Sequence, residues 1–142
     1  MPELAEVETV RKKMSEQLKG KKIKEVIVDK SDRYLYAFAP AKEVETALTG
    51  ATIKGAGRKG KYFWLELNRK PWPIFHLGMS GHMTFLNPKS KVHDKIWGGA
   101  KIWEKEDEDL KSRLWFSRLL LIMNAGIEMS FSDPRRFGRM WL

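Results

Sequence analysis

The chain contains no cysteine and only three histidines among its 142 residues. Without cysteine it can form neither a disulfide nor a thiolate zinc site, which excludes disulfide-stabilised secreted domains as a class. The histidines, His76, His82 and His93, are too few and too scattered to predict a metal cluster. No apolar run approaches the length of a membrane span, and the charged N-terminus does not have the pattern of a signal peptide. We therefore expect an intracellular, soluble protein that spans no membrane and holds no metal within this chain.

The chain also lacks an internal repeat and a long linker rich in glycine, serine or proline. A chain of this length can bury one hydrophobic core of ordinary size, and a second complete domain would be cramped. We expect one domain over residues 1–142, and a monomer.

Positive charge is in excess, with 27 lysines and arginines against 18 aspartates and glutamates, a net charge of +9. Five of the acidic residues lie in the run Glu104–Asp109, which leaves 26 basic and 13 acidic residues in the rest of the chain. This balance favours a polyanionic partner, nucleic acid first and an anionic membrane second. Lysines that serve solubility alone would give the same composition, so charge does not decide between the two interpretations.

Two helices are predicted from the spacing of apolar residues. The first runs from Glu3 to Leu18 and is followed by Gly20 as a stop signal. Its apolar face consists of Leu4, Val7, Val10, Met14 and Leu18. A second, short helix is predicted over Ala41–Leu48, between Pro40 and Gly50.

Most of the remaining chain consists of short runs rich in β-branched and aromatic residues, separated by Gly, Pro or Asn. The predicted strands are Lys22–Asp29, Arg33–Phe38, Thr52–Arg58, Tyr62–Leu67, Pro73–Leu77, His82–Leu86, Arg118–Asn124 and Gly126–Phe131. A tight hairpin turn is predicted at Asn124-Ala125-Gly126. The polar segment Asn87–Ser117 has the least regular pattern and is predicted to be a long insertion loop. The fold class is therefore α+β but mainly β: a two-layer antiparallel β-sandwich, or flattened barrel, with a long N-terminal helix and a second short helix.

The first residues, Met1-Pro2-Glu3, contain a candidate nucleophile. If Met1 is removed, Pro2 has a free secondary amine beside a carboxylate, whereas retention of Met1 makes this nitrogen an amide that cannot attack. A secondary amine condenses with a sugar aldehyde to an iminium ion, whose positive charge promotes the breaking of neighbouring C–O bonds. Helix initiation alone also explains these residues, because proline suits the first turn of a helix and carboxylates suit its N-terminus.

Two further clusters have residues that suit a ligand. In His76–Gly81 two glycines bracket Met79 after a strand, which lets the backbone approach a ligand and pushes the methionine outward. A packed turn is the alternative. In Asp133–Gly138 two arginines precede Phe137, a combination that suits phosphate contact and base stacking. Salt-bridged arginines on a surface loop are the alternative.

Taken together, Met1–Glu8, Arg58–Tyr62, His76–Gly81 and Asp133–Gly138, in this order and spacing, resemble the N-terminal domain of the formamidopyrimidine-DNA glycosylase and endonuclease VIII family. The resemblance spans nearly the whole chain. The start of the chain combined with Asp-Pro-Arg-Arg-Phe-Gly is typical of the formamidopyrimidine branch. It implies base-excision DNA repair by a bifunctional DNA glycosylase and AP lyase. Such an enzyme flips an oxidised purine, such as 8-oxoguanine or a formamidopyrimidine, out of double-stranded DNA.

The resemblance also implies roles for residues that match the catalytic positions of the family. The Pro2 amine attacks the sugar carbon, the base departs, and the resulting Schiff base drives elimination of the flanking phosphates. Glu3 matches the acid/base residue and Glu6 a supporting carboxylate. Lys61 matches a phosphate-binding residue of the catalytic site.

Other positions match the family's DNA contacts. Lys61, His76 and Arg136 match residues that bind the phosphate backbone through charge-assisted hydrogen bonds. Met79, Arg135 and Phe137 match the trio that fills the gap left by the flipped nucleotide. Within that trio, Arg135 faces the orphaned partner base.

Three features depart from the family pattern. Ala5 stands where the family usually repeats proline, and alanine, a good helix former, should do little structural harm. The Asn87–Ser117 segment looks longer than in bacterial members. The chain ends at Leu142, where the family continues into a helical DNA-binding domain and a zinc finger. We therefore expect an N-terminal catalytic domain alone, with weakened DNA affinity, the family's structural zinc lying in the absent part.

Other functions would use the same residues differently. A non-catalytic damaged-DNA-binding module, or an inactive truncated fragment of such an enzyme, would use the same basic face and gap-filling residues without chemistry. A tautomerase-type enzyme uses an N-terminal proline as a base on small acids, which would not explain Met79 or the arginine turn.

Overall fold

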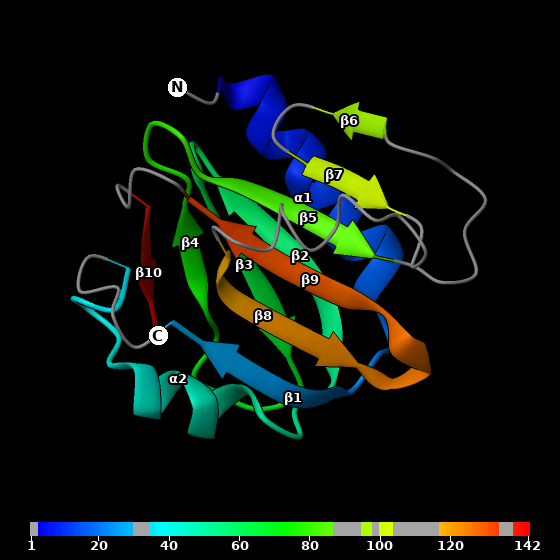
Figure 1. Ribbon diagram of the computed structural model, residues 1–142, viewed down its shortest axis with the longest axis vertical. Helices are drawn as coiled ribbons and strands as arrows, with labels where there is room; N and C mark the ends of the chain where they lie inside the picture. Colours follow the sequence, from blue (N-terminus) through cyan, green and yellow to red (C-terminus); the bar gives the residue numbers. More distant parts are fainter. Residues whose placement is uncertain (1–2, 30–34, 87–94, 98–99, 104–116, 134–137) are drawn as a thin grey trace.

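The computed structural model describes residues 3–29, 35–86, 95–97, 100–103, 117–133 and 138–142. Its helices are α1 (Leu4–Leu18) and α2 (Ala41–Leu48). Its strands are β1 (Ile23–Val28), β2 (Ile53–Lys59), β3 (Tyr62–Leu67), β4 (Ile74–His76), β5 (His82–Leu86), β6 (Lys95–Trp97), β7 (Ala100–Trp103), β8 (Ser117–Met123), β9 (Glu128–Ser132) and β10 (Arg139–Trp141). A six-stranded sheet, in the order β1-β8-β9-β5-β7-β6, lies in front of a four-stranded sheet, β10-β4-β3-β2 (Figure 1).

The core lies between the two sheets and beneath α1. The buried face of α1 consists of Val7, Val10, Met14 and Leu18, as the apolar spacing predicts, whereas Leu4 is 47% exposed. In β3 every second residue is buried, as expected for a strand with one face on the core. A stack of rings crosses the core, because the Phe75 ring lies 5.5 Å from that of Phe63 and 6.1 Å from that of Phe131 on the opposite sheet. The predicted sandwich is confirmed.

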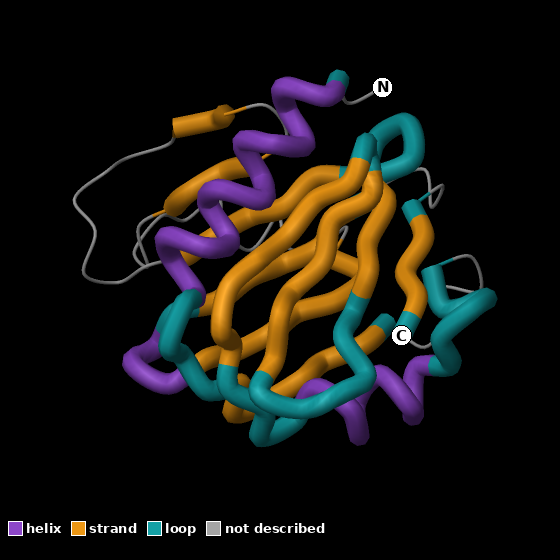
Figure 2. Tube along the Cα trace, turned by 180° about the vertical axis from the view of Figure 1, so that it is seen from behind, coloured by secondary structure: helices purple, strands orange, loops and turns teal. Residues whose placement is uncertain are grey.

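Backbone hydrogen bonds join the two sheets at one corner. The amide of Ile23 donates to the carbonyl of Ala51, and the amide of Ile53 donates to the carbonyl of Lys21, both at 2.8 Å. This corner gives the sandwich the character of a flattened barrel. Helix α1 lies along β2 at the edge of the four-stranded sheet, while α2 packs near β1 (Figure 2). No helix in the part of the chain that the structure describes is long and apolar enough to cross a membrane.

The hairpin turn at Asn124-Ala125-Gly126 is confirmed. The three residues form a short helical turn, η2, between the antiparallel strands β8 and β9. The amide of Met123 donates to the carbonyl of Ile127 at 2.8 Å, which closes the turn.

The prediction of a strand at Arg33–Phe38 is wrong for its described residues, 35–38, which form turns and bends. Leu35 and Tyr36 are consecutive and both buried, whereas a strand would turn them to opposite faces. The Tyr36 hydroxyl donates a hydrogen bond to the carbonyl of Arg118 in β8, which holds this turn against the sheet.

The prediction of an insertion loop over Asn87–Ser117 is wrong in part, because the segment contains β6 and β7 and Ser117 begins β8. Strand β7 pairs in parallel with β5 and antiparallel with β6, so the large sheet is not wholly antiparallel. Strands of three and four residues are too short to give a periodic signal. Residues 87–94, 98–99 and 104–116 of that segment lie outside the described residues.

Candidate functional site

Four chain segments meet at one end of the sandwich. The start of α1, the β2–β3 turn, the β4–β5 loop, and the end of β9 with the start of β10 all lie there (Figures 1 and 2). Antiparallel pairing explains the convergence: Lys59 pairs with Tyr62 across the turn, and β5 starts beside the end of β9. We call this end the motif rim and define it by Glu3, Glu6, Lys61, His76, Met79, Asp133 and Gly138.

The start of α1 places two predicted catalytic carboxylates on the motif rim. Glu3 is the exposed N-cap residue, and its carbonyl accepts a hydrogen bond from the amide of Val7 at 3.0 Å. Glu6, in the first turn, is half-buried. The positive end of the helix dipole favours negative charge at both positions. Pro2, the predicted nucleophile, lies outside the described residues.

An ion-pair cluster fixes α1 to the β2–β3 turn. The Glu8 carboxylate accepts a hydrogen bond from Arg11 Nε at 2.7 Å and one from Arg58 Nε at 3.1 Å. Arg58 also donates to the carbonyl of Gly60 at 3.0 Å. The hydrogen bond from Arg11 and then that from Arg58 lower the pKa of Glu8 to about 2, although partial burial opposes this. The turn that carries Lys61 is thus tied to the helix that carries Glu3.

His76 is the last residue of β4, and a hydrogen bond defines the tautomer of its ring. Its Nδ1 accepts the amide hydrogen of Gly78 at 3.0 Å, so the neutral ring carries its proton on Nε2. Burial, and then the positive charge of Lys61, lower the pKa of His76. The ring of Tyr62 lies 5.0 Å from that of His76. The neutral N–H donor at the end of β4 and the lysine ammonium of the β2–β3 turn suit an anionic oxygen.

The β4–β5 loop presents Met79 with half of its surface exposed (50%). The amide of Gly81 donates to the carbonyl of Leu77 at 2.9 Å, which closes the loop. A Cβ atom at Gly81 would lie 2.4 Å from that carbonyl oxygen, so no other residue fits without a shift of the backbone.

The Asp133 carboxylate joins this loop to the start of β10. One oxygen accepts the Ser80 hydroxyl at 2.6 Å, and the other accepts the amide of Gly138 at 2.6 Å. A Cβ atom at Gly138 would lie 2.5 Å from Cζ of Phe131, so this position also needs glycine. The predicted DNA contacts between these two anchors, Arg135, Arg136 and Phe137, lie outside the described residues.

A hollow adjoins the motif rim at the β2–β3 turn. It is lined by Lys59, Gly60, Lys61, Tyr62, Trp64, Ile74 and Trp141. The Trp141 ring lies 5.5 Å from that of Tyr62 and is stacked on Phe38 at 5.6 Å. The sequence motifs include Lys61 and Tyr62 but give no signal for Phe38 or Trp141, which the fold brings together.

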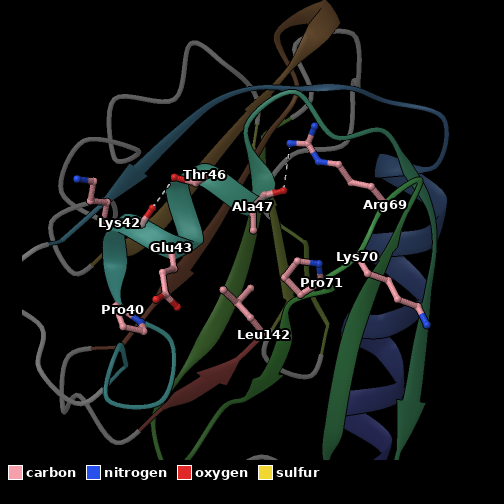
Figure 3. Close-up of a pocket in the computed structure, with 9 residues that line it drawn as sticks. All are labelled: Pro40, Lys42, Glu43, Thr46, Ala47, Arg69, Lys70, Pro71 and Leu142. Carbon is pink, nitrogen blue, oxygen red and sulfur yellow. Dashed lines mark hydrogen bonds between the residues drawn. The ribbon is translucent and has the colours of Figure 1, made fainter.

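A second hollow lies between α2 and the residues that connect β3 with β4 (Figure 3). Leu142 lies between these two walls, and Arg69 donates to the carbonyl of Ala47 at 3.2 Å near the end of α2. None of the predicted site residues that the structure describes lines this hollow. Among the residues that the structure describes, no group of three or more His, Asp or Glu could hold a metal ion.

Residues 1–140 match the sequence model of the formamidopyrimidine-DNA glycosylase N-terminal domain. The chain belongs to the formamidopyrimidine-DNA glycosylase family. It is 37% identical over 142 residues to a formamidopyrimidine-DNA glycosylase of Arabidopsis thaliana, covering all of this chain and 34% of that protein. It is 34% identical over 140 residues to one of Rhodopseudomonas palustris strain BisB18, covering 99% of this chain and 44% of that protein. The chain thus spans less than half the length of these relatives.

Solved structures of formamidopyrimidine-DNA glycosylases have the same fold. A Lactococcus lactis enzyme in complex with DNA containing an oxidised pyrimidine superposes with a TM-score of 0.70 at 25% identity, covering 98% of this chain and 44% of that one. The same enzyme with DNA containing N7-benzyl-Fapy-dG gives a TM-score of 0.70 at 25% identity, covering 98% and 43%. The family resemblance of the four motifs and the predicted fold class are therefore confirmed.

Proposed function

We propose that this chain is the catalytic N-terminal domain of a base-excision repair enzyme that acts on damaged double-stranded DNA. It removes an oxidised purine, 8-oxoguanine or a formamidopyrimidine, and then cleaves the strand as an AP lyase. The observation that carries the proposal is the motif rim, where residues from four separate motifs lie at one end of the sandwich. The names of the relatives and the DNA in the solved complexes support the substrate class.

The chemistry starts at the N-terminus of α1. After removal of Met1, the lone pair of the Pro2 amine attacks the sugar carbon that bears the damaged base, and the glycosidic bond breaks. The nitrogen then loses its proton and its lone pair expels the ring oxygen of the sugar, which is protonated. The opened sugar is held as an iminium ion, which promotes elimination of the flanking phosphates. Glu3, exposed at the same helix end, supplies and removes protons during these steps. Glu6, in the first turn of α1, is the carboxylate that supports Glu3 in this role.

Two groups on the motif rim bind the DNA backbone. Lys61 contributes a positive charge, and the neutral His76 ring contributes an Nε2–H donor. Phosphate contacts of this kind position a duplex without reading its sequence. The net charge of +9 adds a general attraction for the polyanion that weakens with salt.

The remaining predicted contacts replace the flipped nucleotide. The Met79 side chain is exposed on a loop whose backbone is held in place, as a group inserted into a base stack requires. In the proposal, Phe137 fills the stack beside Met79, Arg135 pairs with the orphaned base, and Arg136 binds a phosphate. Extrusion is necessary because the sugar carbon cannot be reached within the stack.

Borohydride trapping on a duplex with an abasic site tests the proposal, because borohydride reduces an iminium to a stable covalent complex. We expect a trapped complex with the chain that lacks Met1, and none with a chain that retains it. A chain that binds the abasic duplex with a free Pro2 amine but gives no adduct would contradict the catalytic proposal. It would favour the non-catalytic damaged-DNA-binding alternative.

A further inference from the structure

Among the described residues, three hydrogen bonds to Asp133 connect parts of the molecule that are far apart in the sequence. We propose that Asp133 is a positioning residue that holds the Met79 loop, residues 78–81, in register with the start of β10. The two segments then approach DNA as one rigid unit. That this unit acts on DNA rests on the proposed function. The coupling of residues 78–81 to the start of β10 through Asp133 is a property of the chain without DNA.

The carboxylate is almost completely buried and satisfied on both oxygens. Asp133 is 1% exposed, and its two carboxylate oxygens accept hydrogen bonds from the Ser80 hydroxyl and from the amide of Gly138. Hydrogen bonds to a charged acceptor are shorter and stronger than neutral ones, and both are 2.6 Å long. Losing either donor would remove a hydrogen bond from a buried carboxylate, which is costly.

The backbone of Asp133 is itself anchored in the large sheet. Arg118 of β8 donates to the Asp133 carbonyl at 3.1 Å and also to the Asp29 carboxylate at 2.7 Å, beyond the end of β1. Arg118 is buried, with 7% of its surface exposed. The Asp133 carboxylate therefore projects from a fixed point, and the loop that it holds takes its position from the sheet.

The contacts of Asp133 go to functional loops rather than to the hydrophobic core. Ser80 directly follows the half-exposed Met79, and Gly138 directly follows the predicted DNA contacts 135–137. The backbone is closely packed at Gly81 and Gly138, because a Cβ atom at either would overlap its neighbour. In the proposed function, both segments enter one gap in DNA, and this requires that their positions relative to each other are fixed.

Amide hydrogen exchange of the free chain, followed by NMR, tests the coupling. Ser80→Ala removes one donor and keeps the Asp133–Gly138 bond, so we expect faster exchange at residues 78–81 with unchanged protection at Gly138. Ser80→Thr keeps a hydroxyl and should restore slow exchange. Ser117→Ala is the matched control, since it also removes a hydroxyl bonded at 2.6 Å, to Ser130, but outside both loops. Exchange at 78–81 that is the same in Ser80→Ala as in the unchanged chain would overturn the proposal.

Binding to DNA tests the use of the coupling. The ratio of affinities for an abasic-site duplex and an intact duplex should fall roughly tenfold in Ser80→Ala, the effect of one charge-assisted hydrogen bond. Ser80→Thr and Ser117→Ala should keep the ratio. An unchanged ratio in Ser80→Ala, together with altered exchange, would overturn the role on DNA. If the unchanged chain itself fails to distinguish the two duplexes, the proposed function is wrong, and the exchange result still decides the coupling.

Discussion

The Arg58 guanidinium bridges the Glu8 carboxylate of α1, at 3.1 Å, and the carbonyl of Gly60 in the β2–β3 turn, at 3.0 Å. Glu8 and Arg58, fifty positions apart, thus set the distance between α1, which begins at Leu4, and the turn that carries Lys61. The geometry of the motif rim depends on this relationship as well as on the hydrophobic core.

Substitution Glu8→Gln should reduce the rate of borohydride trapping several-fold, because α1 is then free to shift relative to Lys61. The loss of stability should be small, about 0.2–1 kcal/mol, since the side chains of the pair are about a third exposed. Single-turnover trapping and urea unfolding measure the two effects. Glu16→Gln is the matched control, because Glu16 pairs with Lys13 on the same helix at 3.8 Å. Equal trapping rates in the two variants would contradict the positioning role.

Acid should remove the contribution of Glu8 to stability. The pKa of Glu8 is lowered from 4.5 to about 2, so the folded state favours the charged form and the stabilisation is complete above pH 4.5. It is lost as the pH falls from 4.5 towards 2. The difference in unfolding free energy between the unchanged chain and Glu8→Gln should shrink across this window, from about 1 kcal/mol at most because the group is partly solvated. A difference that stays constant down to pH 2 would argue against the ion pairs.

The His76 pKa should lie below its ordinary value of 6.5 and rise when Lys61 is replaced by methionine. Removing a positive charge makes protonation of the ring easier. An NMR titration of the imidazole measures the shift, with Lys59→Met as the control for a nearby lysine that does not lower this pKa. Because the folded state disfavours the charged ring, stability should fall as the pH drops below 6.5. The same His76 pKa in both lysine variants would show that Lys61 does not act on it.

Substitution Gly138→Ala should destabilise the chain by about 1–3 kcal/mol, the cost of overpacking a core position. The new Cβ would lie 2.5 Å from Phe131, whose ring is held in the core against Phe75. Gly55→Ala should cost less, because its Cβ would meet only the flexible end of Glu66 at 3.3 Å. Thermal unfolding compares the two, and equal midpoints would contradict the packing argument.

Local sequence patterns predicted the helices and strands better than they predicted the contacts between side chains that are distant in sequence. The stripe Val7, Val10, Met14 and Leu18 is periodic and lies on the core as expected. Strands β6 and β7 have three and four residues, too few for a period to emerge. Pairs such as Ser80 with Asp133 are distant in sequence, so only the register of β5 against β9 brings them together.

Mass mapping of the borohydride-trapped complex tests the proposed function most directly. The chain, freed of Met1, is trapped on an abasic-site duplex, the DNA and protein are digested, and the modified peptide is sequenced. We predict that the sugar remnant is attached to the peptide that begins at Pro2, on its amine. An adduct on a lysine such as Lys61, with the Pro2 amine free and unmodified, would contradict the account.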